Sequence, residues 1–445
     1  MRPLTGFADL AGLRVGIFGY GVEGHAAAER LEGVAGELVL VDDAEGTGGD
    51  VLVNARGGHD ALATCDVVLK SPGIPRRRAD VLALEARGVT ITSALNLWLH
   101  EVALTRVVAV TGTKGKSTTT SLITFFLRCL GEDAQSLGNI GEPPYRRSVD
   151  SSTGWLIVEV SSFQCVDVDV APGHVVVTSL GADHLDWHGS LDQYVEDKLS
   201  LTRAPGPHRT LVPDTDTFHR MATRFGGDVR YVAPEPPGLS SALGLLGRHS
   251  DSNVALALTT VASLTRRPLE EVRDEVTRRG AQFVALRGRL TTLGSERVGS
   301  ARVRYVDDGL ATSPLPTIAA LEVFADEPVV LIAGGFDRGV DYGPLAGAVA
   351  RRPLATLVVT MGDAGRRLAA ALAEVPGPVD VRRADSMDDA VAEARRFLRS
   401  GGVVLFSPGA PSFDRYRNWE ERSDDFERAV SEQARGWSLG GDSNP

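Results

Sequence analysis

The chain has 445 residues, a length typical of about two to four domains rather than of a single core. Hydrophobic residues make up 43% and charged residues 24%, and no apolar run approaches the roughly 20 residues of a membrane helix. A formal net charge of −11 argues against a nucleic-acid-binding surface over the whole molecule. Three widely spaced cysteines and the absence of a secretory signal pattern predict a cytoplasmic protein.

The first segment begins with a strand at Arg14–Phe18, followed by the turn Gly19-Tyr-Gly21-Val-Glu-Gly24 and an alanine-rich helix. A second strand ends at Asp42, and a further strand, Cys65–Lys70, leads into Ser71-Pro-Gly73. Glycines in such a turn let the backbone approach a phosphate, and an acidic residue about 20 positions on commonly binds a ribose. The pattern indicates a nucleotide site, although a tight strand–helix turn without a ligand fits the same residues.

The second segment begins near Ala103, where the strand Arg106–Val110 runs into a loop and a helix that continues to Leu130. The third segment has strands near Ala301–Tyr305, Val329–Ala333, Ala355–Val359 and Gly402–Phe406, with helices between them. Three successive α/β segments predict mostly parallel, doubly wound sheets. The predicted domains are a Rossmann-like domain at 1–103, a P-loop-type central ATPase domain at 104–290 and a Rossmann-like domain at 291–445. The tail, Gly440–Pro445, is expected to be disordered.

The loop Thr111-Gly-Thr-Lys-Gly-Lys-Ser-Thr118 connects the strand and helix at the start of the second segment. Backbone N–H groups of such a loop hold phosphate oxygens, Lys116 neutralises the β- and γ-phosphates, and the Ser117 hydroxyl reaches Mg²⁺. The usual motif has a glycine where this chain has Val110, so the loop is a shortened relative of the P-loop. We predict that ATP is bound by Gly112, Thr113, Lys114, Gly115, Lys116, Ser117 and Thr118.

This loop resembles the ATP loop of the Mur ligases and of the related folylpolyglutamate synthetases. Three further stretches agree with the Mur ligases in order and spacing: Gly138-Asn139-Ile-Gly141, Glu159-Val-Ser-Ser-Phe-Gln164, and Asp183-His184-Leu-Asp186-Trp-His188-Gly with Tyr194 and Lys198 after it. The likeness covers essentially the whole chain and is strongest to the MurD type, which adds glutamate to UDP-N-acetylmuramoyl-L-alanine. The resemblance to the MurD type in particular depends on the stretch 159–164 and on the terminal stretch 407–419, which reads SPGAPSFDRYRNW.

The resemblance implies an ATP-dependent acid–amino-acid ligase that activates a carboxylate as an acyl phosphate, with two Mg²⁺ ions spreading the negative charge. It implies four catalytic residues, Lys116, Glu159, His184 and Lys198. The metal ligands would be Ser117, Glu159, His184 and Lys198, the last after carbamylation. Apart from the resemblance, Lys198 fits an ordinary solvated helix lysine, and we assign no role to His188.

The resemblance also implies residues for each substrate. Outside the loop, ATP would contact Asn253, Arg289 and Asp308. The UDP-linked substrate would contact Gly19, Gly21, Gly24, Asp42, Ser71, Gly73 and Asn139. Glutamate would contact Thr312, Arg338, Ser412, Phe413 and Trp419.

Several positions depart from the MurD pattern: Ser179, Ser250, Leu310, Pro411 and Ser423. The departures cluster around the amino-acid pocket, where Pro411 restricts the backbone next to Ser412. Inverting the α-carbon of glutamate while its amine still faces the acyl phosphate would displace one carboxylate. We therefore predict L-glutamate as the added isomer, with a separate epimerase acting on the product, and keep D-glutamate as the alternative.

Three other interpretations are compared with this one. A folylpolyglutamate-type synthetase shares the ATP loop but lacks a separate N-terminal nucleotide-binding domain. A nicotinamide-dependent dehydrogenase would use Gly19–Gly24 and leave the ATP loop without a purpose. A non-catalytic ATP-gated regulator has no need of Glu159, His184 and Lys198. We further expect a monomer that binds no nucleic acid and has no membrane span.

Overall fold

The computed structural model describes residues 4–46, 50–181, 183–206, 208–236, 238–298, 300–377, 379–434 and 438–439. The tail predicted to be disordered, Gly440–Pro445, lies outside these residues. Within them, no helix is long and apolar enough to cross a membrane. Internal contacts divide the chain into two units: Met1–Leu239 with His249–Gly280, and Ser240–Arg248 with Ala281–Pro445.

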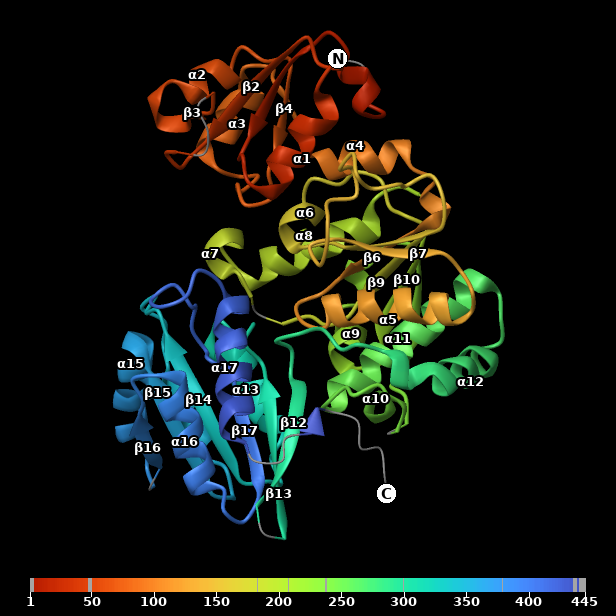
Figure 1. The fold of residues 1–445 in the computed structure, drawn as a ribbon. Helices are drawn as coiled ribbons and strands as arrows, with labels where there is room; N and C mark the ends of the chain where they lie inside the picture. The colour runs from red at the N-terminus through yellow and green to blue at the C-terminus, as the bar shows by residue number, and fades with distance from the viewer. Residues whose placement is uncertain are drawn as a thin grey trace. The chain divides into compact units, whose positions relative to one another are not determined.

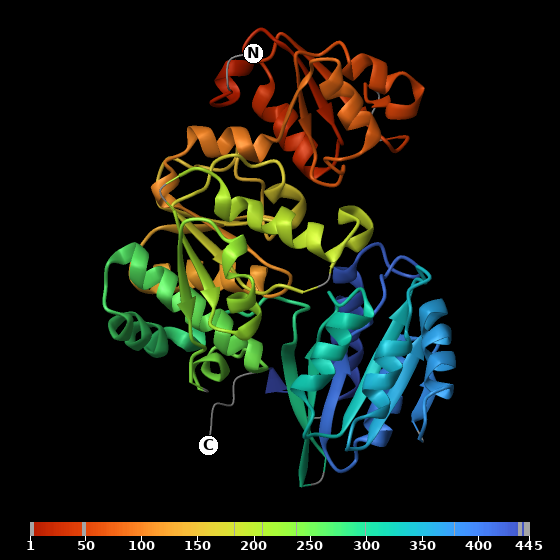
Figure 2. The same cartoon turned by 180° about the vertical axis from the view of Figure 1, so that it is seen from behind.

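The first unit contains two parallel sheets, drawn in red to orange and in yellow to green in Figure 1 and seen from behind in Figure 2. The first sheet has the order β3-β2-β1-β4-β5. Its strands are β1 (Arg14–Phe18), β2 (Glu37–Asp42), β3 (Leu52–Val53), β4 (Val67–Lys70) and β5 (Thr90–Thr92). Its helices are α1 (Val22–Leu31), α2 (Gly58–Leu62), α3 (Ala79–Ala86) and α4 (Ala94–Glu101).

Successive residues of the first sheet pack into different cores, because alternate side chains of a strand point to opposite faces. On β1, Val15 and Ile17 belong to one apolar cluster and Phe18 to another. On β4, Leu69 belongs to the first cluster and Val68 to the second. Both faces of this sheet are therefore covered, which is the doubly wound arrangement that the sequence predicts.

The second sheet has the order β11-β10-β9-β6-β8-β7, with all strands parallel. Its strands are β6 (Val107–Thr111), β7 (Ala134–Gly138), β8 (Trp155–Glu159), β9 (His174–Val177), β10 (Arg209–Pro213) and β11 (Asp228–Val232). Its helices are α5 (Lys116–Cys129), α6 (Ser162–Cys165), α7 (Leu185–His188), α8 (Leu191–Arg203), α9 (Asp216–Arg220), α11 (Arg248–Thr265) and α12 (Leu269–Arg279). Because β6 lies between β8 and β9, the loops that follow these three strands meet at one edge of the sheet.

The second unit contains a sheet of order β16-β15-β14-β17-β13-β12-β18, in which β12 pairs antiparallel with β13 and β18 and the other pairs are parallel. Its strands are β12 (Thr291–Val298), β13 (Ala301–Asp307), β14 (Val329–Gly335), β15 (Thr356–Met361), β16 (Asp380–Arg383), β17 (Gly402–Phe406) and β18 (Ser438–Leu439). Helices α10 (Leu239–Ala242), α13 (Pro314–Val323), α14 (Gly343–Ala350), α15 (Gly362–Ala373), α16 (Met387–Phe397) and α17 (Trp419–Gln433) complete the chain. Val330 and Ile332 of β14 pack into one core and Val329 and Leu331 into another, so this sheet is also covered on both faces.

The predicted α/β class with mostly parallel, doubly wound sheets is confirmed. One sheet lies in each of the three predicted segments. The predicted boundaries at 103 and 290 stay predictions.

Candidate active site

The loop between β6 and α5 has the backbone of a phosphate cradle. Gly112 has φ 141° and Gly115, which precedes the first residue of the 14-residue helix α5, has φ 85°. A Cβ on Gly112 would lie 2.1 Å from Thr178 Oγ1, and one on Gly115 would lie 2.6 Å from Asn253 Oδ1. Both positions therefore require glycine, and the loop leads directly into the N-terminus of α5, where the N–H groups of a helix can bind an anion. Asn253, which is predicted to contact ATP, therefore lies next to this loop.

Two lysine ammonium groups meet at this loop. Lys116 Nζ donates to Gly112 O at 2.9 Å and to Thr113 O at 3.1 Å, and Lys198 Nζ, from α8, donates to the same Gly112 O at 2.9 Å. Lys198 is 1% exposed, so it is not a solvated surface lysine. Burial, reinforced by the charge of Lys116, lowers the pKa of Lys198 to about 7. Part of the Lys198 population is therefore uncharged at neutral pH.

Glu159, the last residue of β8, supplies a buried oxygen that lacks a partner. Its side chain is 2% exposed, and its Oε2 accepts no hydrogen bond from the residues that the structure describes. Burying such an oxygen lowers the free energy of unfolding by about 1–3 kcal/mol unless a cation or a hydrogen-bond donor contacts it. Ser117, in the first turn of α5, is also buried. The carboxylate oxygen of Glu159 and the hydroxyl oxygen of Ser117 are both ligands that suit Mg²⁺.

His184, another predicted metal ligand, lies at a more exposed position than Glu159 and Ser117. It is half exposed, has φ 49° and lies 4.9 Å from the Phe163 ring. Across the described part of the chain, no three His, Cys, Asp or Glu side chains converge on one point. The oxygen donors of Glu159 and Ser117 fit one Mg²⁺, and the number of ions stays a prediction.

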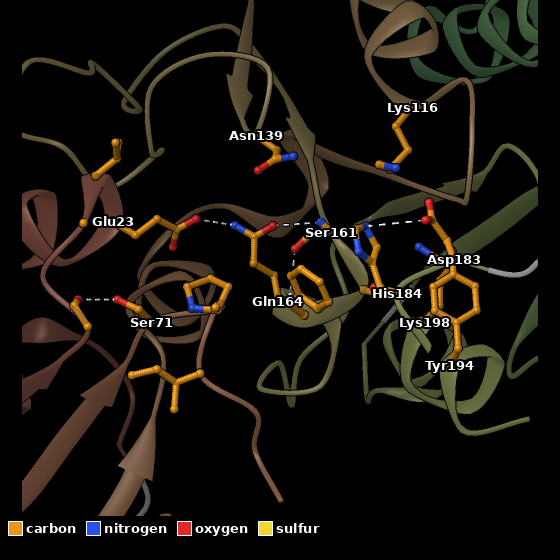
Figure 3. A pocket seen from close by; sticks show the side chains of 18 of the residues that line it. Glu23, Ser71, Lys116, Asn139, Ser161, Gln164, Asp183, His184, Tyr194 and Lys198 are labelled. Carbon is orange, nitrogen blue, oxygen red and sulfur yellow. Dashed lines mark hydrogen bonds and ion pairs between the residues drawn. The ribbon is translucent and has the colours of Figure 1, made fainter. Parts of the chain in front are cut away.

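A cavity of about 580 Å³ joins the glycine turn of the first sheet to the phosphate loop of the second. Figure 3 shows its lining, with Glu23 and Ser71 near one end and Lys116, Asp183 and Lys198 near the other. Nine of the predicted residues line it: Gly19, Gly21, Asp42, Ser71, Gly73, Asn139, Lys116, His184 and Lys198. The structure therefore brings the predicted nucleotide and catalytic residues together.

Two predicted residues have structural roles in this region. Gly24 does not line the cavity; a Cβ there would lie 2.2 Å from Gly19 O, so its glycine permits close packing of α1 on β1. Asp42 fixes the turn itself, because its Oδ2 accepts from Tyr20 N at 2.6 Å and its Oδ1 from Ala44 N at 2.8 Å. On the other side, Ser71 Oγ donates to Gly19 O at 2.5 Å.

Sequence reasoning assigned no role to a hydrogen-bonded group across the middle of the cavity. Glu23 Oε1 accepts from Gln164 Nε2 at 2.6 Å, and Glu23 Oε2 accepts from Tyr145 Oη at 2.8 Å. Gln164 Oε1 accepts from Ser161 N at 2.8 Å, as Figure 3 shows. Burial raises the pKa of Glu23. The signal for Gln164 was present in the stretch 159–164, whereas nothing in the sequence pairs it with Glu23.

A second group that the sequence did not reveal surrounds His188. Its Nδ1 lies 2.7 Å from Asp197 Oδ2, and its Nε2 lies 3.0 Å from Ser162 Oγ. Burial raises the pKa of Asp197, but hydrogen bonds from Arg77, His188 and Gln193 outweigh it and leave the pKa below its usual value. Burial also lowers the pKa of His188. The neutral ring therefore donates from Nδ1 to Asp197, and the Ser162 hydroxyl donates to Nε2.

The remaining predicted residues lie in the second unit: Arg289, Asp308, Thr312, Arg338, Ser412, Phe413 and Trp419. Asp308 is buried and accepts from Ser407 Oγ at 2.7 Å, and burial raises its pKa to about 7. Ser412 is buried, whereas the Arg338 guanidinium is exposed and lies 5.8 Å from the centre of the exposed Phe413 ring. Trp419, the first residue of α17, leaves no room for a side chain at Gly288, because a Cβ there would lie 2.6 Å from its ring. Arg289 and Thr312 are exposed.

Comparisons with known proteins show which family the chain resembles. The Mur ligase middle domain model matches residues 110–232, and the model named Mur ligase, glutamate ligase domain matches residues 288–409. UDP-N-acetylmuramoyl-L-alanine--L-glutamate ligase of Micromonospora sp. is 38% identical, over 96% of this chain and 98% of that protein. UDP-N-acetylmuramoylalanine--D-glutamate ligase of Symbiobacterium thermophilum is 33% identical, over 91% and 90%. The MurF ligase from Thermotoga maritima in complex with ADP has a TM-score of 0.54 at 14% identity, covering 98% of this chain and 100% of that one, and shares the fold.

The fold, the phosphate loop and these matches define an ATP-dependent ligase that forms a carbon–nitrogen bond. The chain belongs to the Mur ligase family. The family predicted from the motifs is thereby confirmed.

Proposed function

We propose that the chain joins L-glutamate to UDP-N-acetylmuramoyl-L-alanine during synthesis of the peptidoglycan precursor, with ATP converted to ADP and phosphate. The main support is the single cavity lined by Gly19 and Gly21 at one end and by Lys116 and Lys198 at the other. A substrate held by its nucleotide at the glycine turn presents its far end, the alanine carboxylate, to the phosphate loop. Such an arrangement serves an activation in which a carboxylate oxygen attacks the γ-phosphorus of ATP.

The reaction brings several negative charges into one place. The carboxylate takes the γ-phosphoryl group to give an acyl phosphate and ADP, and the amine of glutamate then attacks the acyl carbon and releases phosphate. Lys116, together with the N–H groups at the start of α5, neutralises the triphosphate. In the second unit, Arg289 and Asp308 are the residues we propose for the remainder of ATP, and Asn253 for the adenine.

Mg²⁺ would be held by Ser117 and Glu159, with His184 and a carbamylated Lys198 as ligands of a second ion, and it would supply further neutralisation of phosphate charge. The partnerless Oε2 of Glu159 supports the first of these positions. The lowered pKa of Lys198 supports carbamylation, because only the uncharged amine can attack CO₂, losing a proton to give a carbamate. A carbamate converts this buried cation into an oxygen ligand.

The isomer is proposed from two observations. The relative that is 38% identical is named as an L-glutamate ligase, whereas the D-glutamate ligase reported above is 33% identical. Two departures from the MurD pattern, Leu310 and Pro411, also lie within two positions of residues proposed to hold glutamate, Thr312 and Ser412. Among the proposed residues, Arg338 suits a bidentate grip on one carboxylate and Ser412 and Thr312 suit the other. Addition of L-glutamate would require a separate epimerase to invert the product, and D-glutamate remains the alternative. The monomeric state and the cytoplasmic location also stay predictions.

Phosphate release should be measured with UDP-N-acetylmuramoyl-L-alanine, ATP, and D- or L-glutamate in parallel, with the product identified by mass spectrometry. We expect release of phosphate and a product enlarged by one glutamate residue, with L-glutamate preferred. A strong preference for D-glutamate would overturn the isomer while leaving the ligase. Addition of another amino acid would show that the assignment of the glutamate pocket is wrong.

A further inference from the structure

Asp197 on α8 has a carboxylate whose hydrogen-bonding capacity is used completely. Its side chain is 3% exposed. Arg77 donates to it twice, from Nη1 to Oδ2 at 2.9 Å and from Nη2 to Oδ1 at 2.6 Å. His188 Nδ1 lies 2.7 Å from Oδ2, and Gln193 Nε2 donates to Oδ1 at 2.7 Å. These contacts occupy the roughly four lone-pair sites of a carboxylate.

Three walls of the cavity are defined by their segments: the nucleotide wall, which contains residues 71–74, the wall that contains Ser162, and the wall that contains Lys198 of α8. The carboxylate of Asp197 is connected to all three. Arg77 follows the segment 71–74, whose residues line the nucleotide end. His188 Nε2 in turn lies 3.0 Å from the hydroxyl of Ser162, the first residue of α6, which lines the cavity. Asp197 itself precedes Lys198, which lines the phosphoryl-transfer end. One buried carboxylate therefore contacts all three walls directly or through a single side chain.

A second contact holds the segment 70–77 against the stretch of chain between α6 and β9. Lys70 Nζ lies 2.7 Å from Asp167 Oδ2, and both side chains are buried. Lys70 Nζ also donates to Ile74 O at 2.8 Å, within the nucleotide wall. Asp167 Oδ1 also lies 3.7 Å from Arg76 Nε, so Asp167 holds the segment 70–77 at two points, and Asp197 holds its last residue, Arg77. Loss of the Asp197 contact would release the end of the segment without detaching the wall, so an Asp197 variant is expected to fold.

We propose that Asp197 is a positioning residue that locks the three cavity walls together and thereby couples occupancy of the nucleotide end to the placement of Lys198. This inference rests on the proposed function, because it assumes that a uridine nucleotide occupies the glycine turn. Its physical basis is the sensitivity of group transfer to distance, since a misplacement of about 1 Å can cost about 100-fold in rate.

The first test compares two Asp→Asn substitutions on the same helix. Asp197→Asn replaces one acceptor by an amide N–H₂ that faces the Arg77 donors, whereas Asp192→Asn alters an exposed carboxylate that pairs with Arg224. For Asp197→Asn we expect kcat/KM for UDP-N-acetylmuramoyl-L-alanine to fall at least about tenfold and the KM for ATP to stay within about twofold, because the buried carboxylate loses its charge while the half-exposed Arg77 keeps its own. Asp192→Asn should match wild type. A lowered Tm for Asp197→Asn with unchanged kcat/KM would show a purely structural role and overturn the proposal.

The second test asks whether Arg77 and Asp197 act as one unit. If they do, Arg77→Ala combined with Asp197→Asn should be no worse than Asp197→Asn alone, because residues of one hydrogen-bonded network have non-additive effects. Losses that multiply in the double variant would mean independent roles and would contradict the coupling. Arg77→Lys, which keeps the charge and loses the bidentate geometry, should give an intermediate loss.

The third test uses UDP alone, which can fill only the nucleotide end, and follows hydrogen–deuterium exchange. In wild type, UDP should slow exchange both in 19–25 and 71–75 and in 191–203 of α8. In Arg77→Ala, protection should remain in the first two segments and disappear from α8. Equal protection of α8 in both proteins would refute the coupling while leaving the nucleotide site intact. Absence of protection in every segment would refute the proposed nucleotide site, and the coupling with it.

Discussion

Gly112 is the position of the phosphate loop at which one added methyl group should do most damage. Its φ of 141° lies in a region that side-chain-bearing residues rarely adopt. The added Cβ would lie 2.1 Å from Thr178 Oγ1 and 2.9 Å from Ser179 N. The Thr178 hydroxyl oxygen lies 2.6 Å from Lys114 O and 3.2 Å from Thr111 O and shares its one proton between them, so moving it breaks contacts that hold the loop. The Ser179 amide belongs to the backbone and cannot rotate away.

The backbone strain and the lost hydrogen bonds together give the expected loss of ATP-binding free energy in Gly112→Ala. Backbone strain of this kind costs about 1–3 kcal/mol, and each lost buried hydrogen bond adds about 1 kcal/mol. A total of about 3–5 kcal/mol corresponds to an ATP Kd raised at least about 100-fold. Calorimetric titration of ATP would measure it, with Gly181→Ala as the matched control, because a Cβ at Gly181 meets nothing within 4 Å. An ATP Kd for Gly112→Ala within about threefold of wild type would refute the loop geometry as the basis of binding.

Four further substitutions test the remaining site. Lys116→Ala should abolish ligation in a folded protein, because a phosphate-binding cation contributes several kcal/mol to transition-state stabilisation; near-normal turnover would contradict this role. Lys198→Ala should lose activity and regain part of it with added short-chain carboxylate, whereas full activity without rescue would make Lys198 dispensable. Arg338→Ala should raise the KM for glutamate at least about tenfold and leave the KM for ATP unchanged; a change in both would argue against a dedicated carboxylate contact. Because burial raises the pKa of Asp308 to about 7, the folded state binds a proton that the unfolded state releases, and this contribution to stability is lost as pH rises from about 4 to about 7. Urea unfolding at several pH values gives the free energy of unfolding as a function of pH, and that of Asp308→Asn should fall less steeply than that of wild type between pH about 4 and about 7. An identical pH dependence in the two proteins would show that Asp308 does not cause it.

The strands that the sequence predicted best are short, continuous apolar runs. The strand predicted at Arg14–Phe18 is β1, and the one predicted at Gly402–Phe406 is β17, without a shift at either end. Their residues are buried on both sides of a sheet, which makes the apolar run unambiguous. By contrast, β12 at Thr291–Val298 was not predicted. It pairs antiparallel at the side of its sheet, contains Gly294 and a register irregularity, and has no apolar run to mark it.

The site was predictable as far as local motifs reach. The phosphate loop and the loop after β4 were both placed at strand ends from sequence alone, and strand ends of a parallel sheet are where ligands bind. Contacts between distant segments were not predictable. Arg77 and Asp197 are 120 positions apart, and Glu23 and Gln164 are 141 apart, so no spacing pattern links either pair. Only the packed structure shows that these polar side chains satisfy one another.

The departure at Pro411 has a different meaning in the folded protein than in the sequence. The buried Arg422 of α17 donates from Nη1 to Pro411 O at 3.1 Å and from Nη2 to Ala410 O at 3.0 Å. Phe336 N donates to the same Pro411 O at 2.9 Å. The backbone on the N-terminal side of Ser412 is therefore held by side-chain and main-chain donors, in addition to the φ that proline fixes.

A backbone held this firmly cannot select between glutamate isomers by moving. Ser412 is 2% exposed and follows this held backbone, whereas Arg338 and Phe413 are exposed. Inverting the α-carbon moves one carboxylate relative to the other, and a fixed Ser412 can serve as the reference point for only one of them. If Ser412 and Arg338 hold the two carboxylates of glutamate as proposed, discrimination between D- and L-glutamate depends on the reach of the exposed Arg338 side chain from this held backbone. Replacing Pro411 by alanine should then change the preference between isomers less than replacing Arg338 by lysine does.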